Sequence, residues 1–433
     1  MTRRLRWLCV TGLLGPLLVA VASLAAEPAP HLHEPDWSLI SGVPAAPPLA
    51  ARAALLVDVD SRTILYAKNS DLVLPPASLT KLVAIDVALL AAERGELVAD
   101  EPFTPPAVSW AENQPAGSSL MFLGAGQHLT LSDLLLGLSV SSGNDAAVAL
   151  ATWLDGDVPT FAGRMNARMR ELGLVDPHFV EPSGLSPQNL ITARSFARFL
   201  VAHLERFPDA VEQYYNVRSY TYPDSRHRLV TSARQGITQS NRNTLLWSFD
   251  GADGFKTGFI DESGYHLAAT ALRDGRRLIA IVLGIDAGSH AAGGALRAAE
   301  ASALLEYGFS QFVRLRYDYP EPAPVRVYRG KRPVVVPDGP RDAIIVVPAG
   351  TESRVDAMRE QRDSVLAPAA ATAVGRVSIS IDGVVLASES LVLPAQEAGS
   401  VWRRVLDTII LVIRGLAAMV TGRGESMQVP SGP

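Results

Sequence analysis

The stretch Pro75-Pro76-Ala77-Ser78-Leu79-Thr80-Lys81 places a serine hydroxyl and a lysine amine three residues apart where a helix is predicted to begin. The prolines favour a helix start, and apolar residues then recur at three- and four-residue spacing until Gly95. Residues three apart share one helix face, so Lys81 can reach the Ser78 hydroxyl. A serine needs a base to remove its proton, and a desolvated lysine can be that base. Alone, this spacing more often belongs to a solvated helix face than to a catalytic pair.

Two further motifs supply what a serine acyl-transfer site would need. Residues 141–145 (SSGND) form a turn between two predicted helices, where Ser142 could relay a proton and Asn144 could position a peptide group. Residues 256–258 (KTG) lie on a predicted strand and offer a cation and a hydroxyl for an anionic group, beside a glycine that lets substrate approach the backbone. Each motif is weak evidence alone, but the three in this order indicate a nucleophilic serine site.

Length and composition predict a globular protein of two or three domains. The 433 residues are 48% hydrophobic and 19% charged, unlike disordered or coiled-coil chains. The formal net charge is -5 and no tract is rich in lysine or arginine, so we expect no nucleic-acid partner.

The N-terminus has the order of a secretory signal peptide, predicted at residues 1–26. Three arginines precede an apolar run at residues 7–21, and small residues follow it. An uncleaved membrane anchor is the alternative, although the run is short for a span of about 20 residues. The only cysteine, Cys9, lies in this segment, so the mature chain would have no thiol for disulfides, catalysis or metal binding.

Residues 27–48 are rich in proline and predict an extended arm or linker. His31 and His33 lie in this arm. With no other metal-binding side chain nearby, they are interpreted as solvated residues rather than metal ligands.

Residues 49–313 are predicted to form an α+β domain, an antiparallel sheet packed with helices. Helical stretches alternate with strand-like ones, and three strands follow closely at residues 254–259, 265–272 and 277–283. Asp274 and Gly275 form a hairpin turn between the last two, which makes them antiparallel neighbours.

The remaining chain changes character twice. Residues 314–396 contain short β-rich runs and predict a small all-β domain without a cluster of catalytic residue types. Residues 397–424 repeat apolar residues at helical spacing with arginines between them, which predicts an amphipathic helix that lies on a membrane surface, followed by a tail at residues 425–433. A helix docked on the protein's own core is the alternative.

The three motifs resemble the S-x-x-K, S-D-N and K-T-G trio of penicillin-binding proteins and class A β-lactamases. The chain closely resembles the low-molecular-mass penicillin-binding proteins that act as serine-type D-alanyl-D-alanine carboxypeptidases. The likeness covers about residues 50–310, with further shared blocks at residues 67–69, 117–133, 179–185, 241–243 and 253–265. It implies a β-lactamase/transpeptidase-like domain, with the second domain and anchor helix less similar.

The resemblance implies a role for each site residue. Ser78 would be acylated, Lys81 would be its base and Ser142 would relay protons. The expected substrate-binding residues are Asn144, Lys256, Thr257, Gly258, Phe259 and Arg297. Among these, Phe259 would share the oxyanion hole with Ser78 through their backbone amides, and Arg297 would bind a carboxylate unless it is a solvated helix residue.

The implied reaction removes the terminal D-alanine from peptidoglycan pentapeptides through an acyl-enzyme, without a metal or organic cofactor. β-Lactams would inhibit by acylating the same serine. The signal peptide and the C-terminal helix would place the site at the periplasmic or extracytoplasmic face of the cytoplasmic membrane.

Three alternatives stay open at the level of sequence: a β-lactamase, a D,D-endopeptidase of the same fold, and a non-catalytic peptidoglycan-binding protein. Glu181 stands where the family usually has asparagine, and class A β-lactamases use a loop glutamate in deacylation. We interpret Glu181 as a structural surface residue, because the chain is far longer than a β-lactamase requires.

Overall fold

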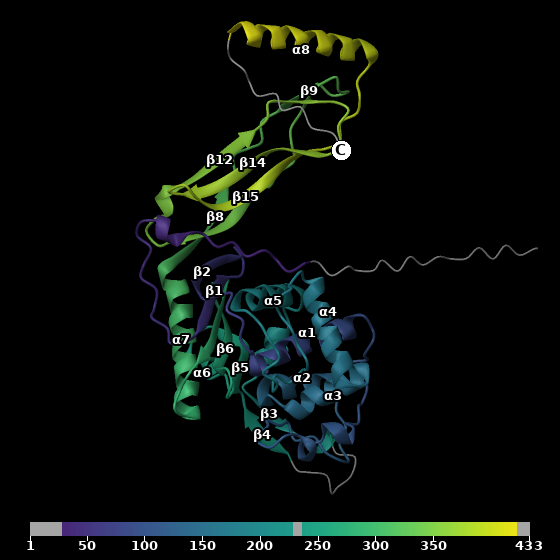
Figure 1. The fold of residues 1–433 in the computed structure, drawn as a ribbon, viewed down its shortest axis with the longest axis vertical. Coiled ribbons are helices and arrows are strands. Elements are labelled where there is room, and N and C mark those ends of the chain that lie inside the picture. Colours follow the sequence, from purple (N-terminus) through teal and green to yellow (C-terminus); the bar gives the residue numbers. More distant parts are fainter. Residues whose placement is uncertain (1–27, 228–235, 422–433) are drawn as a thin grey trace, which may run out of the picture.

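The computed structural model describes residues 28–227 and 236–421, so the predicted signal peptide and the tail at residues 425–433 lie outside the described residues. Figure 1 shows a larger mixed domain, an elongated β-rich domain next to it, and helix α8 (Val401–Thr421) across the far end. The predicted order of an α+β domain, a β-rich domain and a C-terminal helix is confirmed.

The larger domain is built on a five-stranded antiparallel sheet with the order β2-β1-β7-β6-β5. Its strands are β1 (Ala53–Asp58), β2 (Thr63–Lys68), β5 (Ala252–Ile260), β6 (Gly264–Arg273) and β7 (Arg276–Ile285). The predicted turn joins β6 to β7, with Asp274 and Gly275 at φ 50° and 72°, values that suit these two residue types. Strand β5, which carries the KTG motif, is an edge strand of this sheet.

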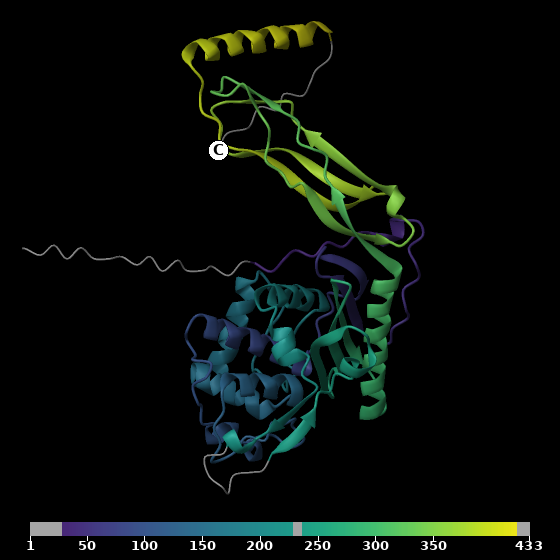
Figure 2. The ribbon, with the colours of Figure 1, turned by 180° about the vertical axis from the view of Figure 1, so that it is seen from behind.

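The two faces of the sheet belong to separate cores, because successive strand residues point to opposite faces. In β1, Leu55 and Val57 pack against a cluster of helices, whereas Leu56 packs on the other face with Leu304 and Leu305 of α7. Figures 1 and 2 show α7 (His290–Gln311) on one side of the sheet and the cluster on the other. The cluster contains α1 (Thr80–Glu93), α2 (Leu131–Leu136), α3 (Asn144–Asp155), α4 (Val158–Glu171) and α5 (Ala193–Arg206).

Two smaller features complete this domain. Strands β3 (Ser219–Tyr222) and β4 (Ile237–Ser240) pair as an antiparallel ribbon, and the short helix α6 (Leu245–Ser248) leads into β5. Helix α2 begins with a capping box: the Thr130 hydroxyl accepts from the Asp133 amide, and the Asp133 carboxylate accepts from the Thr130 amide.

The second domain follows α7 directly and has its own apolar core. Its strands are β8 (Phe312–Asp318), β9 (Val325–Tyr328), β10 (Val334–Val335), β11 (Asp342–Pro348), β12 (Val355–Gln361), β13 (Ser364–Leu366), β14 (Thr372–Ile381) and β15 (Val384–Leu393). Three small sheets result, with the orders β10-β9-β13, β11-β8 and β12-β14-β15. A tight turn at Asp382 and Gly383 joins β14 to β15.

The N-terminal arm packs along both domains. The Trp37 indole donates to the Ile64 carbonyl at 2.9 Å in the larger domain, and Ile40 is buried in the core of the second domain. His33 Nε2 lies 2.8 Å from the Val385 carbonyl oxygen. His33 is therefore anchored to β15 and half-buried, whereas His31 is exposed, as expected for a solvated residue.

Helix α8 is held at the second domain by its polar residues. Asp407 is 4% exposed and accepts from the Arg329 backbone amide at 2.6 Å, and Arg414 donates to the Tyr328 hydroxyl at 2.6 Å. The exposed large apolar side chains of α8 are Val401, Trp402, Val405, Leu406, Ile409, Val412, Ile413 and Leu416. In the described chain, no helix combines the length and apolar character needed to cross a membrane.

Candidate active site

Ser78 lies in a short 3-10 turn, η2 (Ala77–Leu79), immediately before α1. Ala77 has φ 49°, in the left-handed region that alanine rarely adopts. Close backbone contacts surround this turn. A Cβ at Gly184 would lie 1.8 Å from the Ala77 carbonyl oxygen. A Cβ at Gly258 would lie 2.9 Å from the Pro76 carbonyl oxygen. The turn is therefore held between a loop and strand β5, both of which need glycine.

Lys81 is fully buried, and its ammonium group has three hydrogen-bond partners. Nζ donates to Ser78 Oγ at 3.0 Å, to Asn144 Oδ1 at 2.8 Å and to the Ser183 carbonyl oxygen. Burial lowers the pKa of Lys81 from 10.5 to about 7, although the charge of Glu181 acts to raise it. A substantial fraction of Lys81 is therefore unprotonated near neutral pH and able to accept the Ser78 proton.

The SSGND corner brings Asn144 to Lys81, whereas Ser142 makes no such contact. Ser142 has φ 57° and is 2% exposed, and its hydroxyl has no hydrogen-bond partner among the described residues. Asp145 fixes the corner by accepting from the backbone amides of Met121, Phe122 and Leu123 at 2.8, 2.7 and 3.0 Å. The corner thus presents Asn144 through a rigid set of backbone contacts.

Strand β5 supplies a second buried lysine. Lys256 is 2% exposed, and Nζ donates to the Thr257 carbonyl oxygen at 3.3 Å. Burial and the charge of Lys81 hold the pKa of Lys256 well below its usual value. Arg297 of α7 donates to the Gly258 carbonyl oxygen at 3.1 Å, and burial lowers its pKa to about 10. Arg297 therefore lies at the KTG strand, and the alternative of a solvated helix residue does not describe it.

Arg242 is a site residue to which the sequence assigned no role. It donates to Ser119 Oγ at 2.7 Å, and its charge lowers the pKa of Lys81, Lys256 and Arg297. The available signal was its position between two asparagines in the shared block at residues 241–243. Four basic groups converge here, so the site suits a ligand carboxylate. Within the described part of the chain, no group of histidine, cysteine or carboxylate side chains could hold a metal ion.

The profile of the protein family described as D-alanyl-D-alanine carboxypeptidase matches residues 41–287. The chain belongs to this family. Over 380 residues it is 33% identical to D-alanyl-D-alanine carboxypeptidase DacA of Haemophilus influenzae, covering 86% of this chain and 91% of the relative. The resemblance based on the three motifs and the shared blocks is confirmed, and with it the assignment as a serine carboxypeptidase.

Solved structures of penicillin-binding proteins have the same fold. Penicillin-binding protein 5 of Haemophilus influenzae superimposes with a TM-score of 0.72 at 31% identity, covering 82% of this chain and 99% of that one. Penicillin-binding protein D2 of Listeria monocytogenes, solved in its cefotaxime-bound form, gives a TM-score of 0.53 at 30% identity, covering 62% of this chain and 100% of that one.

Glu181, the residue that departs from the carboxypeptidase pattern, organises a loop. Its carboxylate accepts from the amides of Ser183 and Gly184 at 2.6 and 2.7 Å and from Asn189 Nδ2 at 2.9 Å. This loop delivers the Ser183 carbonyl to Lys81. Both carboxylate oxygens are engaged by donors of the protein, so the contacts favour a structural role for Glu181 over that of a deacylation base.

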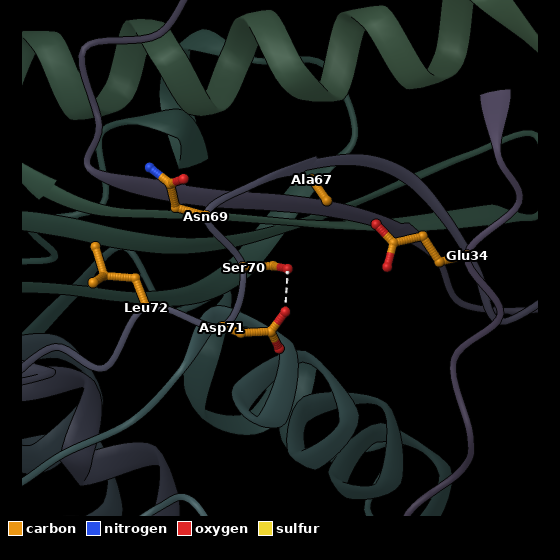
Figure 3. A pocket seen from close by; sticks show the side chains of 6 residues that line it. All are labelled: Glu34, Ala67, Asn69, Ser70, Asp71 and Leu72. Atoms are coloured by element: carbon orange, nitrogen blue, oxygen red, sulfur yellow. Dashed lines mark hydrogen bonds between the residues drawn. The ribbon is translucent and has the colours of Figure 1, made fainter. Parts of the chain in front are cut away.

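A hollow beside the arm is separate from this carboxypeptidase site. It is lined by Glu34, Ala67, Asn69, Ser70, Asp71 and Leu72, and Figure 3 shows the Ser70 hydroxyl directed at the Asp71 carboxylate. Arg194 joins Glu34 to Asp71 through ion pairs of 2.7 Å each. The hollow contains none of the predicted site residues, and its charges connect the arm to the larger domain.

Proposed function

We propose that this carboxypeptidase removes the terminal D-alanine of peptidoglycan pentapeptide stems through an acyl-enzyme on Ser78. The observation that carries the proposal is the fully buried Lys81 amine, 3.0 Å from Ser78 Oγ, with a pKa of about 7. A base whose pKa lies near the working pH combines the reactive protonation state with a useful driving force for proton transfer.

Acylation begins when unprotonated Lys81 takes the Ser78 proton and Oγ attacks the carbonyl of the penultimate D-alanine. The backbone amides of Ser78 and Phe259 stabilise the resulting oxyanion. The carbon–nitrogen bond then breaks. The proton held by Lys81 passes to the amine of the departing D-alanine, which leaves an ester on Ser78. The predicted relay through Ser142 requires the bound substrate to bridge the two groups, because the Ser142 hydroxyl does not contact Lys81. Asn144 keeps the Lys81 amine in place through their hydrogen bond.

The basic groups at β5 recognise the terminal carboxylate of the substrate. Lys256 and Thr257 bind it directly, while Arg297, fixed to the Gly258 carbonyl, adds positive charge at the same end of the strand. Desolvation makes the buried cation Lys256 costly without a counter-ion, and a bound carboxylate provides one.

Deacylation returns the enzyme to its starting state. Lys81 takes a proton from water, the hydroxide attacks the ester carbonyl, and Ser78 regains its proton as the ester bond breaks. A β-lactam combines a reactive carbonyl with a nearby carboxylate, so the same residues acylate Ser78 with it. Its leaving amine stays tethered to the acyl group, which hinders the attack of water.

The direct test is release of D-alanine from a pentapeptide ending in D-alanyl-D-alanine. We expect one D-alanine and one tetrapeptide per substrate with the native chain, and no release with Ser78→Ala. Release by Ser78→Ala at the native rate would refute the assignment of the nucleophile. Conversion of penicillin without any release of D-alanine would instead favour the β-lactamase alternative.

We also propose that the chain is exported and that α8 holds it at the outer face of the cytoplasmic membrane. The arrangement of α8 supports this: Asp407 and Arg414 bind the second domain, while its large apolar side chains are exposed. An apolar helix face flanked by arginines suits the interface between acyl chains and anionic headgroups. The export step rests on the signal-peptide pattern alone.

A further inference from the structure

A buried chain of polar side chains begins on the helix that carries Lys81. Asp86 of α1, His203 of α5 and Tyr215 at the end of η6 (Val211–Tyr215) are each 0% exposed. His203 Nδ1 lies 2.8 Å from Asp86 Oδ1, and the Tyr215 hydroxyl lies 2.7 Å from His203 Nε2. Arg168 of α4 donates to the other Asp86 oxygen at 2.7 Å.

The protonation states in this chain follow from its partners. Burial alone would raise the pKa of Asp86. The hydrogen bond and charge of His203 and the charge of Arg168 outweigh this effect, so the net pKa is lowered and Asp86 is ionised. An ionised carboxylate only accepts, so Nδ1 of His203 carries a proton. Burial raises the pKa of Tyr215, so its hydroxyl stays protonated and forms the hydrogen bond with His203 Nε2. Each of these hydrogen-bonding atoms is satisfied, and none is exposed to substrate.

The far end of the chain contacts strand β5 just before Lys256. The rings of Tyr215 and Phe255 meet edge to face, with centroids 5.3 Å apart at 72°. A Cβ at Gly254 would lie 3.1 Å from Tyr215 Cβ, so glycine permits this close approach. Contacts therefore run without a break from α1, which carries the base, to β5, which carries the KTG motif.

An edge strand has its backbone ladder on one side only, and β5 pairs with β6 alone. Side-chain contacts must fix its other side. We propose that Asp86, His203 and Tyr215 are positioning residues that fix β5 relative to α1 and so set the distance from Lys256 and Thr257 to Ser78. The proposal rests on the proposed function in one respect, namely that β5 binds the carboxylate of the molecule that acylates Ser78.

The test is the second-order rate constant for acylation by benzylpenicillin, measured against pH in Tyr215→Phe well below its melting temperature. We expect the rate to fall roughly tenfold or more at every pH, since misplacement of positioning groups by about 1 Å can cost on the order of 100-fold. The midpoint of the pH profile stays unchanged, because the Lys81 contacts are intact. Tyr222→Phe is the matched control: Tyr222 is 1% exposed and its hydroxyl bonds Gln127 instead.

Three results would overturn the proposal: an unchanged rate in folded Tyr215→Phe, a shifted midpoint, or an equal loss in Tyr222→Phe. Phe255→Leu keeps every hydrogen bond of the chain and removes only the ring contact with Tyr215. It serves as the second variant if Tyr215→Phe does not fold, and it should lower the rate with the same unchanged midpoint. Failure of the native chain to be acylated on Ser78, or an unchanged rate in Lys256→Ala, would instead refute the proposed function.

Discussion

The pH dependence of acylation follows from the burial of Lys81. An exposed lysine with a pKa of 10.5 is unprotonated in only about 1 molecule in 3,000 at pH 7, whereas a pKa of about 7 leaves about half of it unprotonated. Burial therefore increases the reactive form on the order of 1,000-fold at neutral pH. We expect the acylation rate constant to rise with a midpoint near pH 7 and to level off above about pH 8.

Two charge removals should move this midpoint in opposite directions. The charge of Glu181 raises the pKa of Lys81 and that of Arg242 lowers it, so Glu181→Gln should shift the midpoint down and Arg242→Gln should shift it up. Glu205→Gln is the control, because Glu205 is an exposed partner of Arg62 far from the site. The assay is the rate of labelling by a fluorescent penicillin between pH 5 and 10. A midpoint near 10 in the native chain, or shifts of the same sign in both variants, would refute this account of the base.

Further predictions concern stability, the nucleophile turn, the arm and the tail. The stability of the native chain relative to Lys81→Met should rise between about pH 7 and 10 in urea unfolding, because the folded pKa of about 7 is depressed and the unfolded state binds more protons there. Gly184→Ala should slow acylation on the order of 100-fold, since its Cβ would lie 1.8 Å from the Ala77 oxygen; a native rate would contradict the crowding. Trp37→Ala should cost about 2 kcal/mol of unfolding free energy by losing its packing and its bond to Ile64, and no loss would show that the arm is not packed in solution. Deleting residues 400–433 should release active protein into the soluble periplasmic fraction, and continued membrane association would contradict the anchor.

The features of the fold that could be predicted from the sequence are those set by neighbouring residues. The Asp274 and Gly275 turn and the helix that starts after Ser78 depend on residues within a few positions of one another, so their patterns appear directly in the chain. The packing of the arm depends instead on Val385 of β15, more than 300 positions from His33, and no local pattern reports such a contact.

In the candidate site, too, the features set by local spacing could be predicted, whereas those set by contacts between distant residues could not. Ser78 and Lys81 share a helix face, so their proximity was predictable from a spacing of three. The Ser183 carbonyl that contacts Lys81 is a backbone group, which sequence motifs do not mark. The role of Glu181 depends on the amides that it meets after folding, and the lowered pKa of Lys81 depends on burial by distant elements. Arg242 stood in a recognisable block, but only the fold brings its charge to the two lysines.

Identification of the residue that benzylpenicillin modifies tests the central claim most directly. Intact-protein mass spectrometry followed by proteolytic mapping should show one added penicilloyl group per chain, on the peptide that contains Ser78. Ser78→Ala should remain unmodified, while Ser61→Ala, which removes a half-buried turn serine bonded to Asp58, should be labelled like the native chain. An adduct on Ser142 or on any other residue, or labelling of Ser78→Ala at the native level, would contradict the account.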